Sequence, residues 1–105
     1  MPARFFLAVL AIAGLADQAL AQEPAVRGRA LLKELCSSCH AIDKLDVSPR
    51  PAAPPLRMIG QSFDLDDFAR RLRTGLASTH PDMPEFRFGE DDADAVVAYL
   101  RTIQQ

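Results

Sequence analysis

The sequence predicts an all-α fold: one small domain with about three main helices. Three segments carry apolar residues at the spacing of an amphipathic helix, and no segment shows the strict alternation of a half-buried strand. Proline-bearing stretches separate these segments and favour loops between them. A chain of 105 residues has room for one modest core, and domains of this size often need a disulfide, a metal or a cofactor for stability.

The N-terminal segment, residues 1–21, is expected to be a secretory signal peptide that is cleaved after Ala21. It has a cationic start, a short apolar run at Phe5–Leu15 and the small residues "ALA" just before the cleavage point. That run is shorter than the roughly 20 apolar residues that span a bilayer, which favours cleavage over retention as an N-terminal anchor. We therefore expect a periplasmic protein whose mature chain, residues 22–105, is a single domain without stable membrane insertion.

The first helix is predicted from about Pro24 to Cys39. A proline is tolerated in the first helical turn, because its missing N–H would have no partner there. Leu32, Cys36 and His40 follow Gly28 at intervals of four residues, so these positions share one side of the helix. A glycine inside a helix costs about 1 kcal/mol relative to alanine, and Gly28 therefore indicates the close approach of another backbone.

A long loop is expected from Ala41 to Phe63, because four prolines interrupt this stretch. A loop of this length in so small a domain usually wraps around something. The second helix lies within "DLDDFARRLRTG", where Asp64 can cap the start and Gly75 can close the end.

The third helix is predicted to start near Glu90 or Asp91 and to run to about Ile103. Its first turn is acidic, which suits the positive end of a helix dipole, and its apolar residues follow the helical period. Together the helices and the long loop supply the expected core residues: Leu32, Leu56, Phe68, Leu72, Val97 and Leu100.

The stretch "CSSCH", residues 36–40, holds the only two cysteines of the chain and one of its two histidines. This C-x-x-C-H pattern is a signature of covalent haem attachment. Cys36 and Cys39 can each form a thioether with one edge of a single porphyrin, and His40 can then face the iron as the proximal axial ligand. Both sulfurs are used, which explains the absence of any other cysteine. We therefore expect one covalently bound haem c, with its iron, as the cofactor.

Other uses of these residues fit less well. A structural zinc usually takes four Cys or His ligands, and His40 directly follows Cys39, which makes joint tetrahedral ligation awkward. A redox-active dithiol normally sits in a βαβ setting, and the sequence predicts no strands. A plain disulfide between Cys36 and Cys39 explains neither the adjacent histidine nor the long loop. An exported dithiol or zinc module is therefore kept only as an alternative.

The second axial position of the iron decides the function, and "HPDMPEF", residues 80–86, offers the candidates. Met83 stands between two prolines that stiffen the backbone and can present its sulfur rigidly, so it is favoured as the distal axial ligand. His80 is the next candidate, although it also fits an ordinary turn histidine. Met58 is expected to pack in the core instead.

These residues make the chain resemble the small monohaem class I cytochromes c, a family with bacterial periplasmic members, over almost all of residues 22–105. Gly28 stands where the family has its helix-crossing glycine. The sequence "APPL" at 53–56 resembles the family's Gly-Pro-x-Leu, and "MPEF" at 83–86 resembles the bacterial Met-Pro-x-Phe ligand loop. The sequence "VVAYL" at 96–100 is similar to part of the family's final helix.

The resemblance implies the class I cytochrome c fold, in which the helices wrap around one covalently attached haem. It also implies that Pro54 and Leu56 belong to the haem pocket: the proline carbonyl accepts a hydrogen bond from His40, and the leucine packs on the haem. Two departures stand out, since Ala53 replaces the usual glycine and Pro55 fills the variable place. Either Pro54 or Pro55 could therefore supply the carbonyl. The chain also lacks the dense lysine ring of mitochondrial cytochrome c, so docking rules from that protein are not transferred.

A haem iron held by both His40 and Met83 has no position left for a substrate, so we expect an electron carrier, not an enzyme, without catalytic residues. Its expected partners are a redox donor and a redox acceptor (an oxidase, a bc-type complex or a periplasmic dehydrogenase) that dock transiently on a monomer. The net charge of −2 gives no support to nucleic-acid binding. With an open iron or with His80 as ligand, the alternative is a gas sensor or a weak peroxidase.

Overall fold

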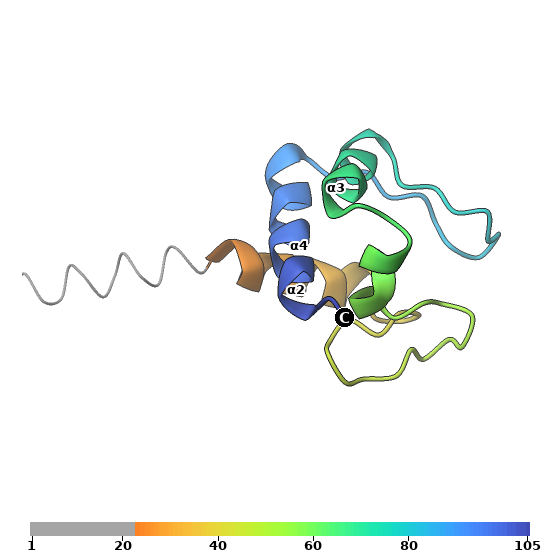
Figure 1. The fold of residues 1–105 in the computed structure, drawn as a ribbon. Helices are drawn as coiled ribbons and strands as arrows, with labels where there is room; N and C mark the ends of the chain where they lie inside the picture. Colours follow the sequence, from red (N-terminus) through yellow and green to blue (C-terminus); the bar gives the residue numbers. More distant parts are fainter. Residues whose placement is uncertain (1–22) are drawn as a thin grey trace, which may run out of the picture.

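The computed structural model describes residues 23–105 of the chain, and this part is helical (Figure 1). The predicted all-α fold is confirmed. An isolated antiparallel bridge between Leu76 and Phe86 is the only strand-like pairing within these residues. The helices, in chain order, are α2 at Glu23–Leu35, the 3₁₀-helix η2 at Leu56–Gln61, α3 at Leu65–Thr74 and α4 at Glu90–Ile103.

The signal peptide expected at residues 1–21 lies outside the described residues. Among residues 23–105, no helix combines the length and the apolar character that crossing a membrane would take.

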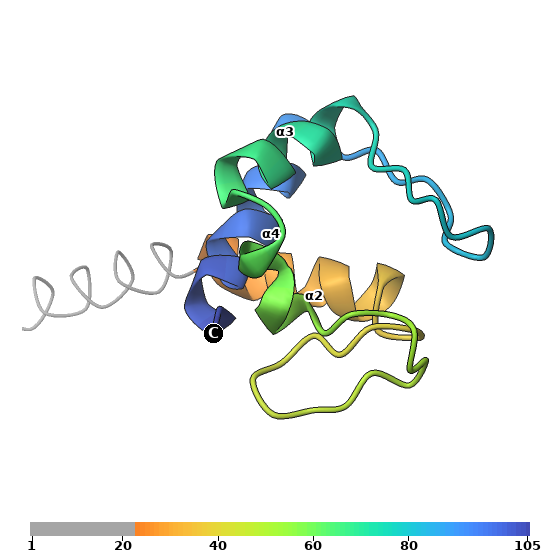
Figure 2. The same cartoon turned by 45° about the vertical axis from the view of Figure 1, so that its right-hand side comes forward.

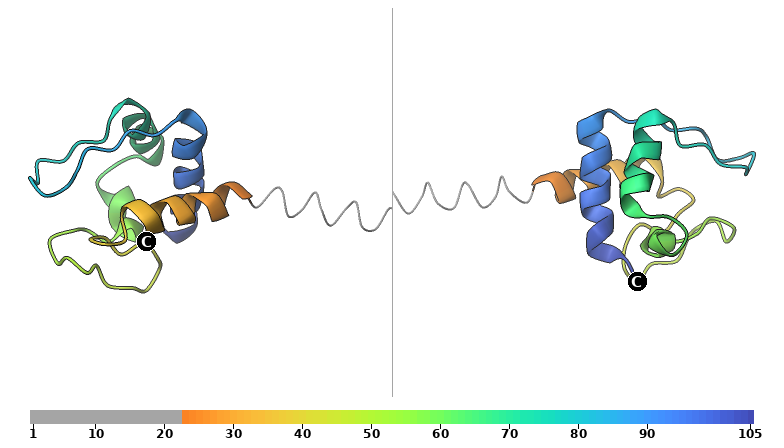
Figure 3. Two further views of the ribbon diagram at one scale, coloured as in Figure 1. Left: turned by 180° about the vertical axis from the view of Figure 1, so that it is seen from behind. Right: turned by 45° about the horizontal axis from the view of Figure 1, so that its top comes forward.

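Helix α2 packs across α4 (Figures 1 and 3). The two helices are in contact at Gly28. A Cβ placed on Gly28 would lie 1.9 Å from the carbonyl oxygen of Ala95 and 2.9 Å from the backbone nitrogen of Val96. The two backbones are therefore in direct contact, and no side chain fits between them. The close approach predicted from a glycine inside the first helix is confirmed.

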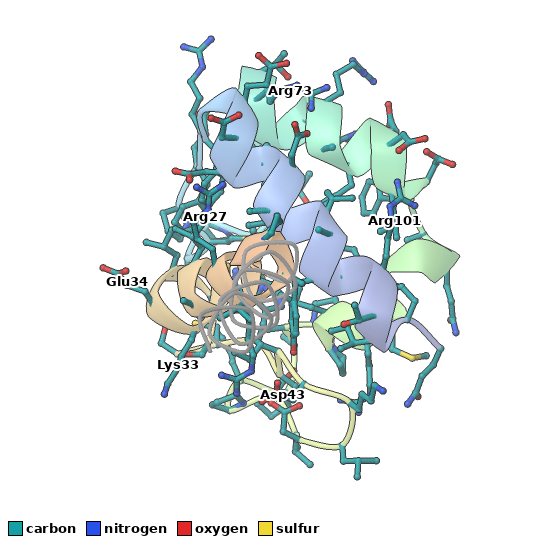
Figure 4. The ribbon with its side chains drawn as sticks, turned by 90° about the vertical axis from the view of Figure 1, so that its left-hand side faces the viewer. Arg27, Lys33, Glu34, Asp43, Arg73 and Arg101 are labelled. Atoms are coloured by element: carbon teal, nitrogen blue, oxygen red, sulfur yellow. The ribbon has the colours of Figure 1, made fainter. Side chains whose placement is uncertain are left out.

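The core lies where α3 and α2 pack on α4, with η2 at its edge. Val96 and Leu100 of α4 are completely buried. Two ion pairs on the outside also join α3 to α4, near the two ends of α3: Arg73 with Asp94 and Arg101 with Asp66 (Figure 4). All six residues expected in the core are at most 7% exposed: Leu32, Leu56, Phe68, Leu72, Val97 and Leu100.

Helix α3 begins and ends where its sequence signals predicted. The Asp64 carboxylate accepts hydrogen bonds from the backbone N–H groups of Asp66 (2.9 Å) and Asp67 (3.2 Å), which otherwise have no partner in a first helical turn. Gly75 follows the last turn with φ +125°, a backbone angle that other residues rarely adopt. The third predicted helix is likewise confirmed as α4, starting at Glu90.

Two predicted boundaries are wrong. Helix α2 ends at Leu35 and not at Cys39, because the Ser37 hydroxyl bonds back to the Lys33 carbonyl and the Ser37 N–H shifts to the carbonyl of Leu32 (3.1 Å). Serines compete for backbone groups in this way and favour turns over helix interiors. The loop expected up to Phe63 also ends earlier, since the short helix η2 follows its last proline.

The two long segments between the helices extend to the same side of the molecule (Figures 1 and 2). One runs from the end of α2 to η2, through residues 36–55. The other joins α3 to α4 and forms a narrow hairpin, closed at its base by two backbone hydrogen bonds between Leu76 and Phe86, of 2.7 and 3.0 Å. The helices thus act as the frame from which these two segments project.

Candidate functional site

A cavity of about 260 Å³ lies among the turn after α2, the proline-bearing loop and the hairpin. Each of these three segments contributes residues that the sequence singled out. Leu35, Ala53 and Phe86 add apolar surface to the wall. The predicted site residues that line the cavity are Cys36, Cys39, His40, Pro54 and Met83, together with the alternative ligand His80.

Cys36 and Cys39 lie half-buried in the turn that follows α2, and both thiols are free. The turn is held by the backbone N–H of His40, which donates to the Cys36 carbonyl at 2.8 Å. Burial, with a smaller contribution from nearby Cys39, raises the pKa of the Cys36 thiol to about 11. Cys36 is therefore a neutral thiol at physiological pH, on the wall of the cavity.

The His40 ring is fixed by a hydrogen bond of 2.7 Å between its Nδ1 atom and the carbonyl oxygen of Pro54. A carbonyl oxygen only accepts hydrogen bonds, so Nδ1 carries the proton in the neutral ring and Nε2 keeps a free lone pair. The Pro55 carbonyl instead accepts from the N–H of Met58, at 3.0 Å. Of the two prolines that the sequence left open, Pro54 is the one bonded to His40.

Met83 lies half-buried in the hairpin loop, where its N–H donates to the carbonyl of His80 at 3.2 Å. His80 is exposed, and its Nδ1 atom accepts a hydrogen bond of 3.3 Å from the N–H of Asp82. Both candidates for the second axial position thus belong to the same cavity wall. Met58 lies in η2 and does not line the cavity.

Leu56 is placed differently from the other predicted site residues. It is 7% exposed and belongs to the hydrophobic core, and it is not among the residues that line the cavity. Its N–H donates to the carbonyl of Ala41 at 2.9 Å, which ties η2 to the residue that follows His40. Leu56 therefore packs in the core and holds the segment next to His40 in place through this backbone hydrogen bond.

Two charged residues at the cavity were missed from the sequence. Arg50 and Asp82 both line it, and they form an ion pair of 2.5 Å. This hydrogen bond to the Asp82 carboxylate is the main reason why the pKa of the Arg50 guanidinium is raised. They are 32 residues apart in the chain, so no local pattern could have matched them.

The residues on this cavity fit a covalently attached haem. The chemistry of the donor set is the test: two free thiols on one turn, an imidazole with its Nε2 lone pair unused, and a thioether sulfur on the facing loop. Imidazole and thioether are the axial ligands of electron-transfer haems, and apolar side chains shield such a group from water. Among residues 23–105, no group of three or more His, Cys, Asp or Glu side chains is arranged to hold a metal ion.

This fold and this site define a small α-helical protein in which a CxxCH turn shares a cavity with a hairpin loop that carries Met83 and His80. A family model for cytochrome c matches residues 25–104, nearly all of the described chain. The chain belongs to the cytochrome c family, which confirms the resemblance inferred from its motifs. Its cofactor is haem c, covalently bound, and the protein is a haem-binding electron-transfer protein. No curated protein and no solved structure matches the chain.

Proposed function

We propose that this protein is an exported one-electron carrier whose haem c is attached through Cys36 and Cys39 and ligated by His40 and Met83. One observation carries the proposal: His40, fixed by Pro54, lines the same cavity as Met83 although the two come from opposite loops. An imidazole and a thioether on one cavity would be the two side chains that hold the iron of a single haem.

The haem supplies the one-electron Fe(III)/Fe(II) couple, and the chain's own residues set its surroundings. The hydrogen bond from His40 Nδ1 to Pro54 holds the ring in one orientation and makes Nε2 a stronger donor. The Met83 thioether favours the reduced iron and raises the potential. The same two side chains would hold the iron in both oxidation states, so the protein would need little rearrangement between them.

The partners of such a carrier are a donor and an acceptor of electrons. We propose that an oxidase, a bc-type complex or a periplasmic dehydrogenase docks transiently on the monomer. Interfaces of this redox class are small and weak, so electrostatic steering matters more for the rate of encounter than the buried area does. The signal peptide proposed for residues 1–21 would deliver the chain to the periplasm.

A second candidate function rests on His80. This histidine lines the same cavity as Met83, and its Nε2 atom remains available because Nδ1 accepts the N–H of Asp82. With His80 as second ligand, or with an open position, the haem protein would serve as a gas sensor or a weak peroxidase. The dithiol alternative is disfavoured, since redox-active thiols have lowered pKa values and burial raises that of Cys36.

The deciding experiment is a visible and near-infrared spectrum of the protein from a haem-maturing host, first oxidised and then reduced. A low-spin c-type spectrum with the weak sulfur-to-Fe(III) charge-transfer band is expected from ligation by His40 and Met83. A c-type spectrum without that band would move the second position to His80 or leave it open, and carbon monoxide binding separates these cases. No haem absorption after competent maturation would end the cytochrome proposal.

A further inference from the structure

One ion pair joins the proline-bearing loop to the hairpin, two of the three segments that form the cavity. Arg50 belongs to the proline-bearing loop, Asp82 belongs to the hairpin, and their side chains meet at 2.5 Å. Both residues line the cavity, and their side chains are 41% and 58% exposed. The pair therefore lies at the mouth of the cavity, between the wall and the solvent.

The hairpin loop, residues 77–85, has few other ties. Its hydrogen bonds among the described residues stay inside the loop: the N–H of His80 donates to Ser78 Oγ, and the N–H groups of Asp82 and Met83 donate to His80. The base of the hairpin is closed by the bonds between Leu76 and Phe86. Within residues 23–105, the Arg50–Asp82 pair is thus the one hydrogen bond or ion pair that links this loop to the body of the protein.

The other end of the pair is firmly anchored. The backbone N–H of Arg50 donates to the carbonyl of Cys39 at 3.2 Å, and its carbonyl accepts from the N–H of Ala53 at 3.0 Å. The backbone of Arg50 is therefore bonded to the CxxCH turn through Cys39 and to the segment next to Pro54 through Ala53. The pair therefore connects the turn that holds Cys36 and Cys39 to Asp82, which directly precedes Met83.

We propose that Arg50 and Asp82 form a clasp that keeps the hairpin loop closed over the cavity and so positions Met83. Opening the loop requires this pair to break, since it is the hydrogen bond and ion pair that links the loop to the body among residues 23–105. The inference rests on the proposed ligation by Met83, to which it adds the pair of residues that hold the ligand in place. Since both side chains are partly exposed, salt screens the clasp and loosens the loop.

The test uses the oxidised holoprotein and imidazole as an added ligand that competes with Met83. Arg50→Gln, Asp82→Asn and the double variant are compared with the wild type for the rate at which imidazole binds. Each single change is expected to raise this rate by about 2- to 5-fold, the range that corresponds to an exposed ion pair. The double variant is expected to match the single ones, and the swap Arg50→Asp with Asp82→Arg to bring the rate back toward the wild type.

A matched control is Arg101→Gln. Arg101 also forms an exposed ion pair of 2.5 Å, with Asp66, but that pair joins α3 to α4 away from the cavity (Figure 4). Its loss is expected to leave imidazole binding unchanged. Raising the ionic strength is expected to speed binding in the wild type and in Arg101→Gln, and to have little effect once the clasp is removed.

The outcomes separate the clasp from the ligand assignment. Equal rates and equal salt dependence in the wild type and the clasp variants would overturn the clasp. If the wild type lacks the sulfur-to-iron band, ligation by Met83 is wrong, and amide hydrogen exchange in the same variants still decides the clasp. Faster exchange confined to residues 77–85 supports it, and unchanged exchange there rules it out.

Discussion

Gly28 of α2 lies against the carbonyl oxygen of Ala95 in α4, so closely that a Cβ on the glycine would come within 1.9 Å of that oxygen. Helix propensity alone would favour alanine at this position by about 1 kcal/mol. The clash of an alanine Cβ with Ala95 costs more than this gain in helix propensity. The atoms in the way belong to the backbone of α4, so only a shift of one helix can relieve the clash. We expect Gly28→Ala to lower the free energy of unfolding by about 2–3 kcal/mol, measured by denaturant unfolding.

The control for this prediction is Gly89→Ala, since a Cβ at Gly89 meets no atom within 4 Å. Its effect is expected to stay below about 1 kcal/mol, the difference between glycine and alanine at a helix N-cap. Equal losses in the two variants would contradict the backbone contact as the cause.

Met83→Ala tests the second axial ligand directly. Without the thioether, the sulfur-to-Fe(III) charge-transfer band is expected to disappear and the midpoint potential to fall, because the ligand that favours reduced iron is gone. Optical spectra and a redox titration read the two effects. His80→Ala is the comparison and is expected to keep the low-spin spectrum, so a switch to high spin in that variant would reverse the ranking.

Tyr99 is the only tyrosine of the chain, and its hydroxyl lies 2.7 Å from both the Ile42 carbonyl and an Asp43 carboxylate oxygen. Burial and the hydrogen bond to Asp43 raise the pKa of Tyr99 from 10.0 to about 12. The neutral phenol is therefore favoured in the fold, and its contribution to stability is complete below pH 10 and lost as pH rises toward 12. An ultraviolet absorbance titration is expected to show ionisation near the upper value.

Tyr99→Phe complements that titration. The variant is expected to lose about 1 kcal/mol of stability near neutral pH, since it lacks the hydroxyl. The loss stays small because Asp43 keeps its paired hydrogen bonds to Arg29 at 2.9 Å. It is also expected to unfold with a weaker pH dependence between pH 10 and 12 than the wild type. The same alkaline slope in both proteins would assign the effect to other groups.

Asp64→Ala removes the side chain that caps α3. Two N–H groups, those of Asp66 and Asp67, lose their acceptor, and the free energy of unfolding is expected to drop by about 1 kcal/mol. Chemical denaturation measures the loss. Asp64→Asn keeps the acceptor oxygen and is expected to stay within a few tenths of a kcal/mol of the wild type.

Features fixed by neighbouring residues were predicted well from the sequence. Asp64 and Gly75 mark the ends of α3 because a cap and a helix-terminating backbone angle act within one turn. Gly28 indicated a helix crossing because a glycine there has a cost that only a close contact explains. Covalent haem attachment at the CxxCH turn could likewise be predicted, since it depends only on the spacing of five consecutive residues.

Features that depend on distant partners were not predictable. The choice of Pro54 over Pro55 follows from how the long loop folds back on His40, and adjacent prolines give no local signal for it. Arg50 and Asp82 meet only because both loops extend to the same side of the helices. The early end of α2 comes from the Ser37 hydroxyl, which bonds to a helix carbonyl. A serine is a weak signal in the sequence, and the apolar pattern around it predicted a longer helix.

The packing of α2 on α4 also sets the order of events while the chain is made. Residues 90–103 are synthesised after α2, and until they exist the Gly28 face of α2 has no helix to pack against. The contact between α2 and α4 therefore cannot form before residues 90–103 are present. Until that contact has formed, the turn that follows α2 is less buried, and the Cys36 thiol is more accessible than in the folded chain, where burial raises its pKa to about 11.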